Sequence, residues 1–255
     1  MGAHAQKKYS VITLFPELID FYLKESIPGR AQAAGLYELN LVQLRDYAIN
    51  DYGKVDDKVY GGGHGMLIMP EPLYQAWSAV RAESQNPAAI RTLYCSPRGR
   101  KLDQAYVEEL AAEDELVIIC GHYEGVDERA LSACQAEEIS LGDFVLTGGE
   151  LCAMTIIDAV LRLIPGVLPA AEAWQNDSFA HDLLAEAQYS RPAEWRGLKV
   201  PEVLLSGDDK KIDQFRRQSS LLETYQKRPD LLATAKLSKK DWELLINAVK
   251  SLDSK

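Results

Sequence analysis

Three glycine-rich turns are the residues of this chain best suited to hold a ligand through the protein backbone. They lie at residues 61–65 (Gly-Gly-Gly-His-Gly), 121–125 (Gly-His-Tyr-Glu-Gly) and 148–149 (Gly-Gly). Glycine adopts positive φ angles and lets a ligand approach main-chain groups closely. The turns match neither a P-loop nor a dinucleotide-binding G-x-G-x-x-G unit. Three such turns still predict a ligand that is contacted by backbone groups.

The stretch at residues 140–150, Ser-Leu-Gly-Asp-Phe-Val-Leu-Thr-Gly-Gly-Glu, is the most informative of the chain. It begins with residues typical of a strand end, runs through Phe144, Val145 and Leu146, and turns at the two glycines into an expected helix. Glu150, near the start of that helix, suits the positive end of the helix dipole. By itself the pattern predicts a tight strand-to-helix turn as readily as a ligand site.

Strand-like and helix-like segments alternate around these turns. β-rich or continuous apolar runs predict strands at residues 9–14, 37–44, 90–95 and 116–120. Helical patterns are expected near residues 72–83, 103–112, 128–134 and 151–163. This alternation predicts an α/β domain with a mainly parallel sheet. Because ligands bind outside the carboxyl ends of such strands, the turns that follow them could line one crevice.

Length and composition exclude some classes of protein. The 255 residues suffice for one large domain or two modest ones, and 47% of them are hydrophobic. No segment approaches the roughly 18 apolar residues of a membrane span, and no apolar signal region follows the N-terminus. The four cysteines form no C-x-x-C pair and have no metal-type spacing, so buried free thiols are expected. We therefore expect a cytoplasmic protein with no membrane partner.

Charged residues are distributed unevenly along the chain. Residues 1–189 hold 14 Lys and Arg against 28 Asp and Glu, a net charge of −14, whereas residues 190–255 hold 14 against 10, a net charge of +4. The C-terminal part has a helical pattern and contains Lys210, Lys211, Arg216, Arg217, Lys227 and Arg228. Such asymmetry suggests a basic binding module, and a solvated helix face is an equal alternative.

Long motifs in order along residues 9–250 resemble the bacterial tRNA (guanine-N1)-methyltransferase family. The resemblance rests on the sequences at residues 55–66 (Val-Asp-Asp-Lys-Val-Tyr-Gly-Gly-Gly-His-Gly-Met), 94–103 (Tyr-Cys-Ser-Pro-Arg-Gly-Arg-Lys-Leu-Asp), 121–129 (Gly-His-Tyr-Glu-Gly-Val-Asp-Glu-Arg) and 141–151 (Leu-Gly-Asp-Phe-Val-Leu-Thr-Gly-Gly-Glu-Leu). It implies a SPOUT fold, a parallel α/β sheet with a trefoil knot, followed by a small C-terminal helical domain. The expected domains are an S-adenosylmethionine-binding domain at residues 1–168, a linker at 169–185 and a helical tRNA-binding domain at 186–255.

The resemblance also implies the cofactor and the partners. S-Adenosylmethionine would donate a methyl group to guanine 37 of tRNA in a homodimer with a shared active site. Family enzymes are thought to use Mg²⁺, and its need here stays open. By matching motifs, the cofactor pocket would consist of Tyr94, Cys95, Ser96, Gly121, Tyr123, Glu124, Gly125, Leu141, Gly142, Leu146, Gly148 and Gly149.

Methyl transfer to guanine N1 requires removal of the proton on that nitrogen, so the site needs a general base. Asp177 matches the base proposed for the family, and Arg162 matches a basic partner that stabilises charge on guanine O6. A loop or helix-capping acid is the alternative for Asp177, and a structural ion pair is the alternative for Arg162. The resemblance further implies tRNA contacts at Gly65, Asp127, Ser178, Tyr189 and Arg191.

Some positions depart from the family pattern. His64 and Cys152 stand where Pro is common, His122 where Arg is common and Phe144 where Tyr is common. These departures leave two other hypotheses open, a non-catalytic tRNA-binding protein on the same scaffold and a methyltransferase of the same fold acting on another RNA.

Overall fold

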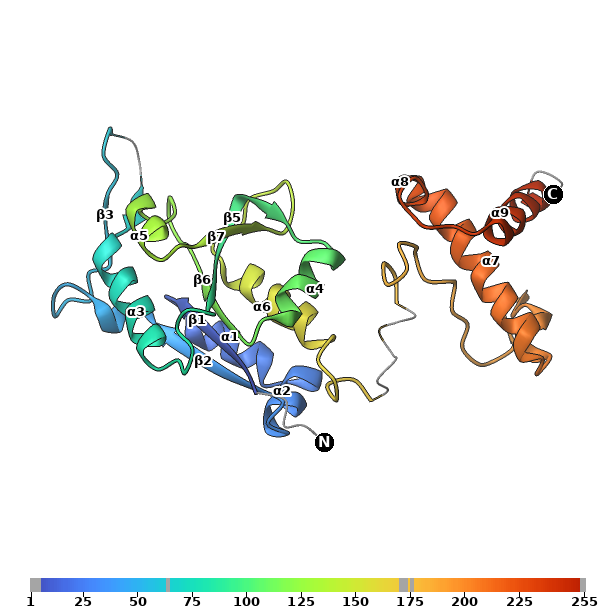
Figure 1. The fold of residues 1–255 in the computed structure, drawn as a ribbon, viewed down its shortest axis with the longest axis horizontal. Helices are drawn as coiled ribbons and strands as arrows, with labels where there is room; N and C mark the ends of the chain where they lie inside the picture. The colour runs from blue at the N-terminus through green and yellow to red at the C-terminus, as the bar shows by residue number, and fades with distance from the viewer. Residues whose placement is uncertain (1–5, 63–64, 170–173, 175–176, 253–255) are drawn as a thin grey trace. The chain divides into compact units, whose positions relative to one another are not determined.

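The chain forms two compact units, Met1–Ala171 and Glu172–Lys255, shown as a ribbon in Figure 1. This computed structural model describes residues 6–62, 65–169, 174 and 177–252. Most of the first part of the expected linker, residues 170–173 and 175–176, lies outside the described residues, as does His64. Leu183, within the same expected linker, is buried in the core of the second unit.

A five-stranded parallel sheet in the order β2-β1-β6-β5-β7 forms the centre of the first unit. Its strands are β1 (Lys7–Thr13), β2 (Tyr37–Gln43), β5 (Arg91–Lys101), β6 (Glu115–Ile119) and β7 (Glu137–Ser140). The expected α/β fold with a mainly parallel sheet is therefore confirmed. A separate antiparallel hairpin joins β3 (Asp56–Lys58) to β4 (Met66–Ile68).

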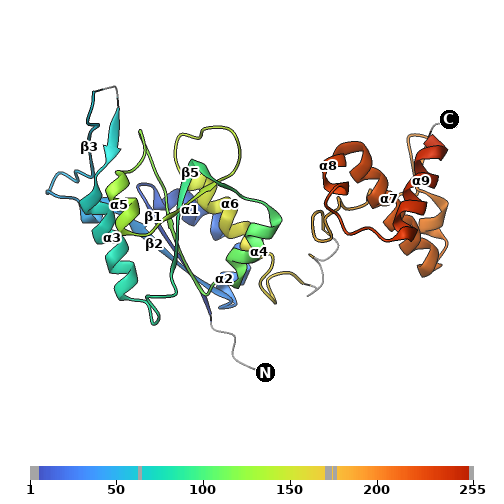
Figure 2. The same ribbon diagram turned by 45° about the horizontal axis from the view of Figure 1, so that its top comes forward.

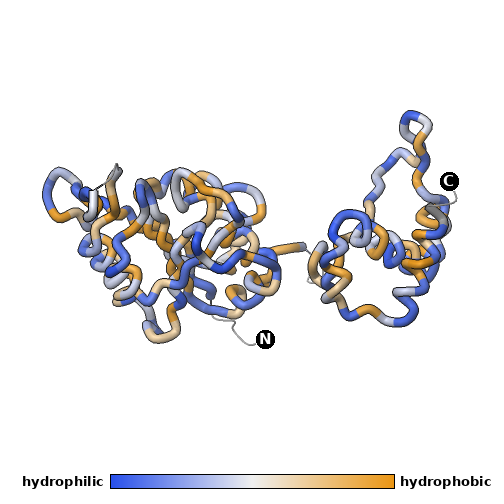
Figure 3. Tube along the Cα trace, turned by 90° about the horizontal axis from the view of Figure 1, so that it is seen from above, coloured by the Kyte–Doolittle hydropathy of each residue, from blue (hydrophilic) through white to orange (hydrophobic). Residues whose placement is uncertain are grey.

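Helices cover both faces of the sheet, because successive side chains along a strand point to opposite faces and both sets are apolar here. In β6, Leu116 and Ile118 belong to one buried cluster, whereas Val117 and Ile119 belong to the other. One face is covered by α1 (Pro16–Leu23), α2 (Ser26–Ala33), α4 (Gln104–Ala112) and α6 (Glu150–Leu161). The other is covered by η1 (Leu44–Tyr47), α3 (Pro70–Ala82) and α5 (Glu128–Ala133). Figure 2 shows the two sets of helices, and Figure 3 shows apolar segments running through the interior of this unit.

The structure corrects the sequence analysis at two strands. The strand expected to stop at Cys95 continues to Lys101, because Ile139 of β7 is the partner of both Cys95 and Arg100 while residues 96–99 bulge out between them. Gly99 allows this, since a Cβ there would lie 2.3 Å from the backbone of Glu138. The strand expected to lead into the glycine turn ends at Ser140, and residues 141–149 form an irregular loop instead.

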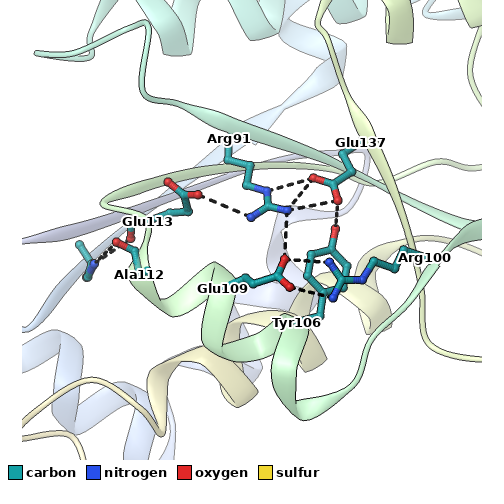
Figure 4. Close-up of polar contacts among 8 residues, drawn as sticks. Arg91, Arg100, Tyr106, Glu109, Ala112, Glu113 and Glu137 are labelled. Atoms are coloured by element: carbon teal, nitrogen blue, oxygen red, sulfur yellow. Dashed lines mark hydrogen bonds and ion pairs between the residues drawn. The ribbon is translucent and has the colours of Figure 1, made fainter.

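A cluster of ion pairs fixes α4 to β5 and β7 (Figure 4). Arg91 Nη2 lies 2.8 Å from Glu137 Oε2, and the Tyr106 hydroxyl donates a short hydrogen bond to the same carboxylate. Arg100, beyond the bulge of β5, stacks 4.0 Å above the Tyr106 ring and pairs with Glu109 at 2.7 Å. Both ends of β5 are thereby attached to the same helix, which holds the bulge between them in place.

The second unit contains helices α7 (Asp209–Lys227), α8 (Pro229–Leu232) and α9 (Lys239–Leu252), a short turn of 3-10 helix η3 (Glu202–Leu205), and a small hairpin of β8 (Glu194–Trp195) and β9 (Leu198–Lys199). The hairpin was not expected in a helical domain. The core of the second unit packs Leu183 against Leu221 of α7 and against Leu244 and Leu245 of α9. No helix in the described part of the chain is long and apolar enough to cross a membrane.

Asp241 connects α9 to α7 in this unit. It forms a capping pair with Ser238, and Arg217 Nε donates to its Oδ1 at 2.7 Å. The hydrogen bond from Arg217 holds the pKa of the Asp241 carboxyl well below its usual range. Because the folded pKa is lower than the unfolded value of about 4, the carboxylate stabilises the unit above that pH and loses this effect as the pH falls.

Asp241→Asn is expected to lower the free energy of unfolding by roughly 1–3 kcal/mol at pH 7, the range for a hydrogen bond to a charged group. The difference from the wild type should shrink below about pH 4, where the carboxylate of the unfolded wild-type chain takes up a proton that the folded carboxylate does not. Thermal unfolding of both proteins between pH 3 and 7 measures this. Asp230→Asn, which removes an exposed pair with Arg228, is the control and should change little. A pH-independent difference would contradict the assignment.

Candidate active site

A cleft of about 450 Å³ lies beside the bulge of β5 and the ends of β6 and β7. This size is within the range of small-molecule and cofactor sites, about 300–1,000 Å³. Three loops form it, namely the bulge of β5, the turn after β6 and the loop before α6. The position agrees with the expectation that the glycine turns line one crevice at the carboxyl ends of parallel strands.

The two glycine turns around this cleft are joined to each other by their backbones. Gly149 N donates to Gly121 O at 3.0 Å, and His122 and Gly148 form an antiparallel bridge. A Cβ on Gly149 would lie 2.7 Å from the Cα of Cys120, and a Cβ on Gly121 would lie 2.9 Å from the Tyr94 hydroxyl. Glycine is therefore required at 149 and favoured at 121 by close packing, and the main chain forms this wall of the cleft.

The structure brings the expected cofactor residues together, with one exception. Those that line the cleft are Tyr94, Cys95, Ser96, Gly121, Tyr123, Glu124, Gly125, Leu141, Leu146, Gly148 and Gly149. Gly142 does not line it and instead lies under Phe144, whose ring would be 2.9 Å from a Cβ at that position.

Some lining residues were not predicted. They are Pro97, Arg98, His122, Val126, Glu128, Ile139, Ser140, Phe144, Val145, Thr147 and Cys152. Most are sequence neighbours of predicted residues, so extending each motif by one or two positions would have found them. Arg98 is exposed, and its guanidinium pairs with Glu138, at 3.0 Å, and Glu128, at 3.3 Å.

Three buried thiols lie at the base of the cleft. Cys95, Cys120 and Cys152 are free and buried, as expected for the cysteines. Burial raises the pKa of the Cys120 thiol, and a hydrogen bond with Cys95 together with burial raises that of Cys152. At neutral pH these groups are therefore protonated, and they fill space under the cleft without acting as nucleophiles.

Gly65 and Asp127, two of the expected tRNA contacts, lie beside the cleft. A Cβ on Gly65 would meet the side chain of Glu124, a lining residue, at 2.5 Å. Asp127 caps α5 by accepting from Arg129 N, and the Arg129 guanidinium lowers the pKa of its carboxyl. Asp127 thus has a structural role in starting the helix that follows the glycine turn.

The two expected catalytic residues belong to different units. Arg162 directly follows α6 in the first unit and is half-buried. Asp177 is an exposed residue of the second unit, in a series of turns where no helix begins, so it does not cap a helix. It lines a second cleft of about 450 Å³ together with Arg216 and Arg217 of α7. That Arg162 and Asp177 act together in one active site stays a prediction.

The remaining expected tRNA contacts are in the second unit. Ser178 Oγ accepts from Ala185 N at 3.0 Å, which fixes the turn that contains Asp177. Tyr189 and Arg191 are exposed in an irregular segment. They are accessible to a large ligand, which is what a tRNA contact requires.

Acids in the second unit pair with several of its basic side chains. Arg217 pairs with Asp241, Arg216 with Glu186 and Arg228 with Asp230. Apart from the partly buried Arg217 pair, these are surface pairs that contribute little to stability, so a phosphate can replace the acid at little cost. The pairing is compatible with both earlier interpretations, a solvated face and a phosphate-binding face.

Within the described residues, no group of three or more His, Cys, Asp or Glu side chains is arranged to hold a metal ion. No chemical step is assigned to Mg²⁺.

Comparison with known proteins identifies the family. The family model of tRNA (Guanine-1)-methyltransferase TrmD matches residues 7–234. The chain is 45% identical over 248 residues to a tRNA (guanine-N(1)-)-methyltransferase of Staphylococcus carnosus, covering 97% of this chain and 100% of the relative. It is 50% identical over 240 residues to the protein of the same name from Moorella thermoacetica, covering 93% and 95%. The chain belongs to the tRNA (guanine-1)-methyltransferase family.

Proposed function

We propose that this protein transfers a methyl group from S-adenosylmethionine to N1 of guanine 37 in tRNA. The observation that carries the proposal is the glycine-walled cleft at the strand ends, in a chain that belongs to the tRNA (guanine-1)-methyltransferase family along residues 7–234. Nearly full-length relatives with that activity in their names support it.

The residues of the cleft fit S-adenosylmethionine. Gly121 and Gly149 line the cleft with main-chain groups, and Leu141 and Leu146 offer apolar contact for an adenine ring. Glu124 is an acidic lining residue that suits a positively charged ligand. When bound, S-adenosylmethionine supplies a methyl group on a sulfonium that leaves readily, so the protein has mainly to align it.

The chemistry assigned to the protein concerns the guanine. Asp177 removes the proton from N1, which gives that nitrogen the electron pair that forms the new bond to the methyl carbon. Arg162 stabilises the negative charge that develops on O6. The second unit holds the anticodon stem-loop through its phosphates, with Ser178, Tyr189 and Arg191 as contacts, so tRNA binding should weaken with salt.

The proposal includes the assembly that the sequence predicts. The first unit is a SPOUT methyltransferase domain with a trefoil knot at the cleft, the residues around 169–185 are the linker, and the second unit is the tRNA-binding domain. Two chains form a homodimer in the cytoplasm, in which Arg162 of one chain and Asp177 of the other complete a shared site.

Methyl transfer from labelled S-adenosylmethionine to tRNA transcripts tests the reaction. Transcripts with guanine at position 37 should accept label, whereas matched transcripts with adenine there should not. Label on the guanine transcripts at N1, located by nuclease digestion and mass spectrometry, is the expected result. Label elsewhere would assign another RNA target, and tight tRNA binding without transfer would indicate a binding protein. Either outcome would overturn the proposal.

A further inference from the structure

Glu150 is a buried acidic residue at the first position of α6. Its side chain is only 6% exposed, although burial of a carboxylate is costly unless it is hydrogen-bonded or paired. The start of α6 supplies the positive end of a helix dipole, which compensates part of this cost.

The carboxylate of Glu150 connects three separate parts of the fold. Its Oε1 accepts from Thr13 Oγ1, at the end of β1, at 2.6 Å. Its Oε2 lies 3.3 Å from Nε2 of His122, in the turn after β6. Thr13 Oγ1 in turn accepts from Phe15 N at 3.0 Å, and the Phe15 ring packs against the His122 ring at 5.0 Å between centroids. The contacts form a closed cycle.

This cycle lies directly behind the wall of the cleft. His122 and Gly148 both line the cleft and form a backbone bridge with each other. A Cβ on Gly148 would meet His122 Nε2 at 2.4 Å and Glu150 Oε2 at 2.5 Å. The His122–Glu150 contact therefore occupies the space beside Gly148 and sets how far apart the two glycine turns stand.

We propose that Glu150 is a positioning residue for the methyl donor, which holds the two glycine turns at the separation that the donor requires by binding Thr13 and His122. The inference rests on the proposed function for the identity of the donor. Loss of one partner leaves the others buried without their hydrogen bonds, so the turn at His122 is free to shift relative to Gly148. Affinity for the donor, rather than for tRNA, should then fall.

Two conservative substitutions test this. Thr13→Val keeps the shape of the side chain and removes its hydroxyl, and Glu150→Gln keeps the shape and removes the charge. The full-length variants and their double mutant are titrated with S-adenosylhomocysteine by calorimetry, and steady-state methyl transfer to tRNA is measured. Each single variant should bind S-adenosylhomocysteine about tenfold more weakly and should have a higher KM for S-adenosylmethionine. The KM for tRNA should stay within about twofold.

The double mutant separates positioning from simple helix stabilisation. Substitutions within one hydrogen-bond network have non-additive effects. The affinity of the double mutant for S-adenosylhomocysteine should therefore be only slightly lower than that of the single variant with the lower affinity. Thr13→Ser restores a hydroxyl and should keep wild-type affinity. Glu108→Gln, an exposed residue of α4, is the matched control and should leave affinity and unfolding temperature unchanged.

Three outcomes would overturn the inference. They are wild-type donor affinity in both single variants with a lowered unfolding temperature, purely additive effects in the double mutant, and a failure of Thr13→Ser to restore binding. Wild-type protein that binds S-adenosylhomocysteine but transfers no methyl group would instead overturn the proposed reaction, and the comparison of affinities would still decide the role of Glu150.

Discussion

Asp177→Ala is expected to lower the turnover of methyl transfer by roughly 10²–10⁴-fold, the range for loss of a general base. Guanine N1 carries a proton at neutral pH, and without a base the nitrogen lacks a free electron pair to attack the methyl carbon. Asp177 is exposed and belongs to the second unit, whereas the cleft proposed to bind the methyl donor is in the first. The affinity for S-adenosylhomocysteine should therefore be unchanged, and single-turnover kinetics with saturating tRNA measures the chemical step.

Two further variants make this test specific. Asp177→Asn keeps the size and hydrogen-bonding capacity of the side chain but cannot take a proton, so it should be about as slow as Asp177→Ala. Glu243→Ala removes an exposed acid from α9 in the same unit and should leave turnover unchanged. Near-normal turnover in Asp177→Asn would exclude Asp177 as the base and favour the alternative that it is a loop acid.

Periodicity identified most strands and helices of the first unit because their burial follows from the sequence alone. The continuous apolar run of β6 is buried on both faces, and Asp103, a residue type that favours helix N-caps, accepts from Tyr106 N at 2.8 Å at the start of α4. The bulge of β5 was not predictable in this way. Pro97 and Gly99 normally end a strand, and only the pairing of Ile139 with both Cys95 and Arg100 shows that the strand resumes.

Helical spacing predicts that α9 buries an apolar stripe made of Trp242, Leu245, Ile246, Val249 and Leu252. Leu245 and Val249 pack on the core of the second unit, but Trp242 and Ile246 are about half exposed. Leu244 and Ala248 are buried instead, so the buried face is rotated from the predicted one. Apolar residues on several sides of a helix leave its orientation to the tertiary packing, which here is the contact with α7.

The residues of the cleft were found by motif, but the groups behind them were not. Glycines in a turn indicate an approach to a ligand from sequence alone. The role of Glu150 depends on Thr13, which is 137 residues away, and on His122, and no local spacing relates the three. Such supporting residues become visible only when the fold brings the end of β1, the turn after β6 and the start of α6 together.

Gly149→Ala is expected to reduce donor affinity by roughly tenfold to a hundredfold, which corresponds to about 1.4–3 kcal/mol. The added Cβ would lie 2.7 Å from Cys120 Cα and 3.0 Å from Gly121 N. Both are backbone atoms at the end of β6, so no side-chain rotation relieves the overlap. The turn at Gly121 must move away from α6, which breaks the hydrogen bond from Gly149 N to Gly121 O and distorts the wall of the cleft.

Calorimetric titration with S-adenosylhomocysteine and thermal unfolding together test this prediction. Gly53→Ala is the matched control, because Gly53 has a φ of +73° with no atom within 4 Å of its Cβ position and does not line the cleft. Alanine there should lower stability by about 1–2 kcal/mol through backbone strain alone and leave donor binding intact. If both variants lose the same stability and Gly149→Ala keeps its affinity for S-adenosylhomocysteine, then donor binding does not require contact between the two turns. Loss of affinity in Gly149→Ala alone would establish that the close approach of residues 121 and 149 forms the donor site.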